Sequence, residues 1–231
     1  MNTFARWGTA HWAAIVITLV IPLLLAWWSH RGGKEIRMRI VGSAFALLLL
    51  AEIIAQFLYS DRGQSESWKE LMPLHLCDLA LFSCILACTL RKQFLFEIAY
   101  FWGLAGTIHG LLTPDLAYGF PHPQFWLFFI GHGGIVGSVI YLVTGPRMRP
   151  VSQSIKRAYL ALLAYAAISG GFNAVFKTNY GYTCAKPASG SLMDFMGPWP
   201  WYILSLSAAA LLSFLVLYLP WWIKDNLKAA R

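Results

Sequence analysis

Long apolar runs, separated by short charged clusters, are the feature that most constrains how this chain can fold. The first run, from His11 to Trp28, contains no Lys, Arg, Asp or Glu, and further runs of similar character follow it to the end of the chain. A helix needs about 20 apolar residues to cross about 30 Å of hydrocarbon. A soluble domain would need a charged surface, whereas only 12% of these 231 residues are charged and 58% are hydrophobic. The sequence therefore predicts a polytopic integral membrane protein.

The fold class that we expect is all-α, a seven-transmembrane-helix bundle forming a single domain over residues 1–231. The expected spans lie near 10–29, 38–59, 74–90, 94–112, 124–144, 155–176 and 200–223. Only Arg91, Lys92 and Gln93 separate the third and fourth spans, which predicts a tight helical hairpin. Because no small-residue cleavage site closes the first run, we expect it to be retained rather than removed as a signal peptide.

The distribution of basic residues predicts the orientation of the chain. Of the 18 Lys and Arg residues, only five fall on the side of the N-terminus and of loops two, four and six. These five are Arg6, Arg62, Lys69, Lys177 and Lys186. The positive-inside rule then places the C-terminus in the cytoplasm and the N-terminus outside. We expect a multi-pass protein of a bacterial inner (cell) membrane, and no nucleic-acid partner, because the basic residues act as topology signals.

Polar and ionisable side chains gather in the outer half of the expected spans. His132 lies about 12 Å below the start of its span at 1.5 Å per residue, while Glu97 is an exception near an inner end. Such residues are costly in a bilayer and tend to face a bundle interior or a water-filled cavity. The residues gathered in or beside this half are Glu52, His75, Cys77, Asp78, His109, Asp115, His132 and Asn173. They predict a site, although some, such as His75 and Asp115, can instead be solvated at the interface.

The longest loop, 177–199, lies on the same side and is rich in aromatic residues and proline. It begins with Asn179, Tyr180, Gly181 and Tyr182 and ends near Trp199. Trp and Tyr favour the headgroup level of a membrane. The loop is therefore either an aromatic belt or a lid over a cavity, and Asn179 and Tyr180 are candidate supporting residues.

Cys77 is the candidate nucleophile. It lies near the start of its expected helix, where the positive end of the helix dipole favours a reactive thiolate. A histidine on a facing helix, His132 or His109, would complete a Cys-His pair for acyl transfer. The alternative is that Cys77 is an inert packing residue, as we expect for Cys84 and Cys88.

Two further interpretations use the same residues. Nitrogen and oxygen ligands of the kind that zinc accepts are supplied by His75, Asp78, His109, His132 and Glu52. Seven-helix zinc hydrolases of the ceramidase and adiponectin-receptor type carry paired histidines in their last span, however, and 200–223 has none. We therefore expect no metal and no other cofactor. The other interpretation is a non-catalytic transporter or lipid-binding protein, in which Asn173 and the broken outer ends of helices hold a small polar ligand.

Five short segments in one order resemble the YwaF-type bacterial membrane proteins, which are related to the eukaryotic transmembrane protein 164 family. The segments are 74–79 (LHLCDL), 101–106 (FWGLAG), 112–116 (LTPDL), 131–133 (GHG) and 197–202 (GPWPWY). The resemblance runs through almost the whole chain and is clearest from the third span to the seventh.

This resemblance implies lipid acyl transfer. The eukaryotic branch is described as a cysteine-dependent acyltransferase that remodels ether phospholipids. The distantly similar androgen-induced hydrolases cleave fatty-acid esters with a threonine and a histidine. Carried over to this chain, Cys77 takes the nucleophile position and His132 the base position, while His109 matches the pattern less well. The implied function is a lipid acyltransferase or acyl-ester hydrolase whose partners are membrane lipids.

Overall fold

The computed structural model describes residues 2–61, 68–69, 72–187 and 192–229, so that Arg62 of the charge pattern lies outside it. The helices are α1 (Thr9–Ser29), α2 (Lys34–Asp61), α3 (Leu76–Leu90), α4 (Gln93–Ile98), α5 (Leu104–Leu112), α6 (Pro123–Thr144), α7 (Ser154–Phe176) and α8 (Trp201–Ala229). Three shorter turns complete the fold, namely the π-helix η1 (Ala99–Gly103) and the 3-10 helices η2 (Tyr180–Tyr182) and η3 (Leu192–Met196). Within the described ranges, the β pairing is a single isolated bridge between Thr3 and Tyr118.

Within the described residues, six helical runs are long and apolar enough to cross a membrane. Five are the helices α1, α2, α6, α7 and α8, and the sixth is the continuous run 93–112 made by α4, η1 and α5. Helix α3 is apolar but has only 15 residues, which corresponds to a length of about 22 Å. The chain is therefore an all-helical, multi-pass membrane protein with six to seven spans. The sharp reversal expected between α3 and α4 is present, because Arg91 ends α3 in a left-handed conformation and α4 begins at Gln93.

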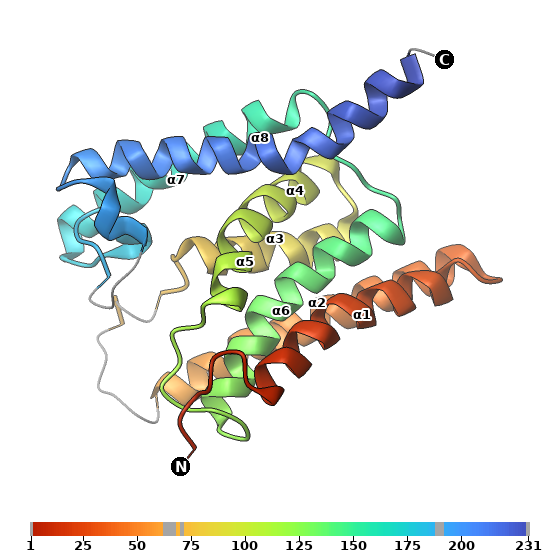
Figure 1. Ribbon diagram of the computed structural model, residues 1–231, viewed down its shortest axis with the longest axis horizontal. Coiled ribbons are helices and arrows are strands. Elements are labelled where there is room, and N and C mark those ends of the chain that lie inside the picture. Colours follow the sequence, from red (N-terminus) through yellow and green to blue (C-terminus); the bar gives the residue numbers. More distant parts are fainter. Residues whose placement is uncertain (1, 62–67, 70–71, 188–191, 230–231) are drawn as a thin grey trace.

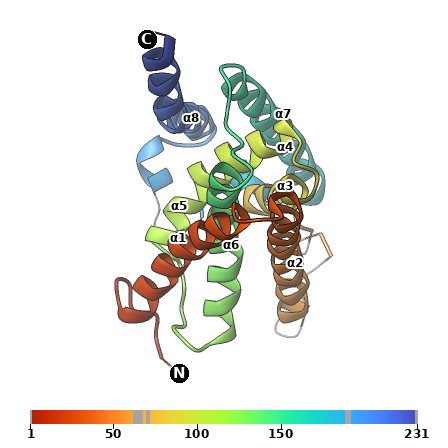
Figure 2. The same cartoon turned by 90° about the vertical axis from the view of Figure 1, so that its right-hand side faces the viewer.

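The helices form three groups across the bundle (Figure 1). Helices α7 and α8 pack together on one side, and α1, α2 and α6 lie on the other. Between them run α3 and the segment made by α4, η1 and α5. The N-terminus and the C-terminus lie at opposite ends of the bundle, which are called here the N-terminal end and the C-terminal end (Figures 1 and 2).

Helix α6 is the central helix, and its glycines are the reason that it can be. It packs against α1, α2, α3 and α5. A Cβ atom added to Gly133 would lie 2.6 Å from Oγ1 of Thr18 on α1, and one on Gly134 would lie 2.6 Å from Cδ2 of Leu49 on α2. Small residues let helix backbones approach closely where lipid provides no hydrophobic driving force between them. The buried face of α6 is therefore shaped for these particular neighbours.

Glu97 joins two of the groups near the C-terminal end. Its side chain is fully buried, and Oε1 accepts hydrogen bonds from Gln93, Ser154 and Arg157. Ser154 and Arg157 belong to the first turns of α7, whereas Glu97 lies on α4. The charge that the sequence places alone at an inner helix end is thus paired, and it fixes the start of α7 against α4.

Candidate functional site

One hydrogen bond sets the register between the helices that carry Cys77 and His132. The Sγ atom of Cys84 on α3 lies 3.8 Å from the carbonyl oxygen of Ile135 on α6 and donates to it. Both helices run from the N-terminal end toward the C-terminal end (Figure 1). Cys77 precedes Cys84 by two helical turns on the same face, a rise of about 10 Å, and His132 precedes Ile135 by about 4.5 Å. By this count along the helix axes, Cys77 is about one turn closer to the N-terminal end than His132 is.

The imidazole of His132 is held in one orientation. Its Nδ1 atom lies 3.1 Å from the carbonyl oxygen of Phe128, and its ring stacks on the Phe128 ring with 4.1 Å between centroids. A carbonyl oxygen only accepts, so Nδ1 carries the proton and Nε2 keeps the lone pair of the neutral ring. The free nitrogen faces α5, where a Cβ on Gly110 would lie 3.4 Å from Nε2. His132 is thus prepared to accept a proton at Nε2.

Glu52 on α2 borders the same turn of α6. A Cβ on Gly131 would lie 3.0 Å from Oε1 of Glu52, so the carboxylate rests against the backbone next to His132. Glu52 is half-buried and interacts electrostatically with Asp78 on α3. Three helices therefore contribute ionisable groups to one region, namely α2, α3 and α6.

The start of α3 is fixed by local bonds and by the loop that follows α7. The N–H group of His75 donates to Oδ2 of Asp78 at 2.9 Å, as in a capping box. The His75 ring lies 4.9 Å from the ring of Tyr180 and 6.2 Å from that of Tyr182. The hydroxyl of Tyr165 on α7 donates to the carbonyl of Leu74 at 2.9 Å. These contacts determine where Cys77, whose side chain is exposed, is presented.

Asn173 organises the loop that begins at Lys177. Its amide nitrogen donates to the carbonyl of Tyr180 and to the hydroxyl of Thr183, and its amide oxygen accepts from the Thr178 hydroxyl and the Tyr180 N–H group. Both amide protons are used in this way, so Asn173 supports the loop and has none left for a substrate. Asn179 plays a similar part, because its oxygen accepts from the N–H groups of Cys184 and Ala185.

Tyr182 joins the site although the sequence did not single it out as a functional residue. Gly181 and Tyr182 both adopt positive φ, and a Cβ on Gly181 would lie 2.7 Å from the hydroxyl of Tyr165, so only glycine fits there. Burial raises the pKa of Tyr182, and the neighbouring Cys77 and Asp115 raise that pKa further. Tyr182 is therefore within electrostatic range of both. The signal in the sequence is its place in the Asn179–Tyr182 run, two residues after Tyr180.

Two candidates stand apart from this cluster. His109 on α5 is exposed, and within the described part of the chain its side chain has no hydrogen bond to a member of the site. Asp115 is exposed in the loop 113–122, where its relation to the site is electrostatic, through Tyr182. Among the described residues, no three His, Cys, Asp or Glu side chains converge on a point where they would hold a metal ion.

Comparison with known proteins gives the context for this arrangement. An uncharacterized protein of Treponema pallidum (strain Nichols) is 27% identical over 220 residues, which cover 94% of this chain and 90% of that protein. No solved structure matches the chain. The model of the TMEM164 family matches residues 6–218, a range that includes α1 to α7, the cluster around Cys77 and His132, and most of α8. The chain belongs to the TMEM164 family.

Proposed function

We propose that this protein is a lipid acyltransferase or acyl-ester hydrolase of the membrane, with Cys77 as nucleophile and His132 as general base. The observation that carries the proposal is the register of α3 and α6. Counted along the helix axes, this register offsets the exposed Cys77 by about one helical turn from His132, whose Nε2 atom carries a lone pair, and this supports the pairing of the two. Membership of the TMEM164 family is consistent with a membrane protein of this type.

The reaction proceeds through a thioester. The Nε2 atom of His132 accepts the proton of the Cys77 thiol as the sulfur attacks the carbonyl carbon of a lipid acyl ester. The tetrahedral intermediate collapses, the ester C–O bond breaks, and the alcohol leaves with the proton from His132. A second alcohol, such as a lysolipid, or water then attacks the thioester, and Cys77 recovers its proton. The acceptor decides whether the protein acts as a transferase or as a hydrolase.

The hydroxyl of Tyr182 is the group that we assign to the developing oxyanion. It lies within electrostatic range of Cys77, and its raised pKa keeps the phenol protonated and able to donate at neutral pH. Asn173, another polar side chain of the same half of the bundle, is committed to the loop instead. Glu52, whose side chain lies against the backbone at Gly131, and Asp78 are further ionisable groups of the same region.

The setting of the reaction follows from the fold and the charge pattern. Lipid would enter sideways between helices at the N-terminal end of the bundle, on the outer side of a bacterial inner membrane. This orientation depends on the excess of Lys and Arg in the loops of the C-terminal end. The whole chain acts as one domain in this scheme.

Intact-protein mass spectrometry tests the proposal. The purified full chain is incubated with a phospholipid of defined acyl chains, and the mass of the protein is followed. We expect a gain of one acyl group that maps to Cys77 and that hydroxylamine removes. The adduct should be absent in Cys77→Ala and form at least tenfold more slowly in His132→Ala.

Cys184→Ala is the matched control, because Cys184 is also exposed but lies in the loop after α7. It should form the adduct at the wild-type rate. An adduct that survives Cys77→Ala, or a folded wild-type protein that forms none, would contradict the thioester scheme.

A further inference from the structure

Helix α8 is longer than the hydrocarbon core of a membrane is thick. Its 29 residues, Trp201–Ala229, correspond to about 43 Å, whereas the hydrocarbon core measures about 30 Å. The residues from Trp201 to Leu219 already span about that thickness, and Pro220 follows inside the helix. The turns beyond Pro220 continue to the C-terminus at the edge of the bundle (Figure 1). These turns, Trp221–Ala229, are called here the α8 tip. If Trp201–Leu219 crosses the hydrocarbon core, the tip falls at the depth of the headgroups.

Two tryptophans hold the α8 tip at that depth. Trp221 points inward, where its Nε1 atom donates to the hydroxyl of Tyr100 at 3.0 Å. Trp222 is 55% exposed. Indole rings favour the membrane interface, because one part of the ring is apolar and another is a hydrogen-bond donor. Trp221 therefore ties the tip to the bundle, and the exposed Trp222 suits it to the interface.

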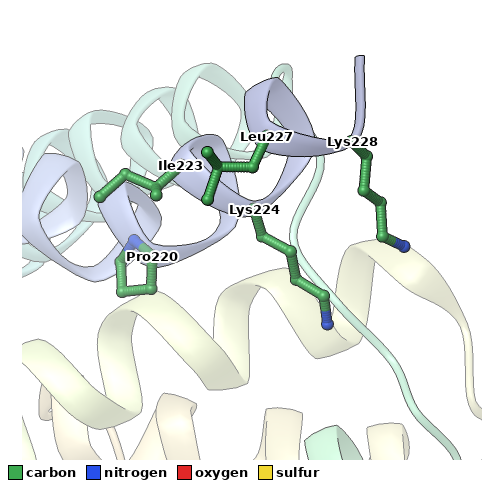
Figure 3. Close-up of a pocket in the computed structure, with 5 residues that line it drawn as sticks. All are labelled: Pro220, Ile223, Lys224, Leu227 and Lys228. Atoms are coloured by element: carbon green, nitrogen blue, oxygen red, sulfur yellow. The ribbon is translucent and has the colours of Figure 1, made fainter. Parts of the chain in front are cut away.

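A groove runs along the α8 tip with apolar and basic walls. It has a volume of about 290 Å³ and is lined by Pro220, Ile223, Lys224, Leu227 and Lys228. Lys224 and Lys228 are four residues apart, and their side chains extend to the same side of the helix (Figure 3). The aliphatic side chains of Ile223 and Leu227 are exposed beside them. The groove thus combines two cations with a surface that suits a hydrocarbon chain.

Among the described residues, no carboxylate pairs with Lys224 or Lys228. Asp225, the one carboxylate of the α8 tip, pairs with Arg149 from the loop after α6. Within the part of the chain that the structure describes, neither Lys224 nor Lys228 has an acidic partner, although Lys224 lies 5.6 Å from the ring of Trp221. A second copy of this chain would present the same basic end, so its approach to the groove would be repulsive.

We infer that the α8 tip binds an anionic phospholipid, whose phosphate lies between Lys224 and Lys228 and whose acyl chain lies along Ile223 and Leu227. The site is separate from the cluster around Cys77, since it is at the opposite end of the bundle, and it stands independently of the proposed reaction. A lipid with net negative charge satisfies both lysines, whereas a zwitterionic lipid brings its own cation to a groove that already holds two.

Native mass spectrometry of the full chain in detergent tests this inference. Wild type is titrated with dioleoylphosphatidylglycerol and, separately, with dioleoylphosphatidylcholine. We expect tighter binding of the anionic lipid. Each lysine near an anionic lipid is worth about a fivefold change in affinity, so Lys224→Gln combined with Lys228→Gln should weaken that binding about 30-fold and leave the zwitterionic lipid unaffected.

The matched control is Lys34→Gln combined with Lys156→Gln, which removes two exposed charges from the same end of the bundle but outside the groove. It should bind the anionic lipid within about twofold of wild type. If both double variants weakened binding equally, the lipid would be recognised by a diffuse basic surface and not by the groove. Equal binding of the two lipids by wild type would also overturn the inference. Circular dichroism of each variant serves as the control for folding.

Discussion

The backbone of α5 at Gly110 lies against the imidazole ring of His132. A Cβ atom on Gly110 would lie 3.0 Å from Cδ2 of His132 and 3.4 Å from its Nε2 atom. The absence of a side chain at Gly110 is therefore what leaves room for the imidazole in its present orientation. The other side of the ring is fixed by the stack on Phe128.

Gly110→Ala should lower the rate of acyl transfer without unfolding the protein. The new methyl group pushes the ring by a few tenths of an ångström, and displacement of a catalytic group by about 1 Å costs about a hundredfold in rate. We expect a loss of about fivefold, measured as acyl-adduct formation. Gly106→Ala is the control one turn away on the same helix, where a Cβ would meet nothing within 4 Å. A Gly110→Ala protein as active as Gly106→Ala would argue against His132 as the base.

The four cysteines should divide into two pairs by their reactivity toward a maleimide. Cys77 and Cys184 are exposed, whereas Cys84 and Cys88 are buried between helices. Two labels are therefore expected on the native protein and four after denaturation, counted by mass. Labelling of Cys84 before Cys77 would show that the face of α3 is assigned wrongly.

Tyr182→Phe should reduce kcat by about a hundredfold, which is the usual cost of removing one oxyanion donor. The KM for lipid should change little, because the aromatic ring remains. Since the pKa of Tyr182 is raised, its phenol is protonated in both the resting and the working enzyme near neutral pH, and the variant should keep the wild-type pH profile. Tyr118→Phe, a second exposed tyrosine, serves as control. Full activity of Tyr182→Phe would assign the oxyanion to another group.

Asn173→Ala should destabilise the loop that starts at Lys177. It removes four hydrogen bonds and leaves buried partners unsatisfied, at a cost of about 2–4 kcal/mol. The midpoint of thermal unfolding in detergent should fall, and proteolysis within 177–187 should become faster. Asn226→Ala removes a single exposed bond to Trp222 and should change stability by less than about 0.5 kcal/mol. Equal midpoints for the two variants would contradict the supporting role of Asn173.

Much of the fold could be predicted from hydropathy alone, since most expected spans match the observed helices within a few residues. The expected span at 124–144, for instance, is the helix Pro123–Thr144. The interruption of 94–112 by the π-helix η1 could not be foreseen, because the run from Ala99 to Gly103 is as apolar as its surroundings. The central position of α6 was not predicted either. The sequence shows that α6 contains glycines, but the close contacts of Gly133 and Gly134 depend on which helix lies opposite.

The candidate site, too, could be predicted only in part from the sequence. Depth along each helix follows from counting residues, and on that basis the sequence assigns Glu52, Cys77, Asp78 and His132 to one half of the bundle. The orientation of a loop depends on hydrogen bonds between residues such as Asn173 and Tyr180, which no periodicity reveals. Tyr182 was missed for that reason. The reactivity of Cys77 stays a prediction.

The glycine-rich face of α6 also has a consequence for the order in which the protein is made. The helices that cover this face, α1, α2, α3 and α5, all precede α6 in the chain. The ribosome therefore delivers the central helix after its partners are already in the bilayer. A nascent chain that has reached Thr144 holds every helix that packs on this face of α6, and α7 and α8 then complete the core with residues such as Ala158 and Phe214. Assembly can in this way proceed from the inside outward during synthesis, with no exposed glycine helix waiting for a later neighbour.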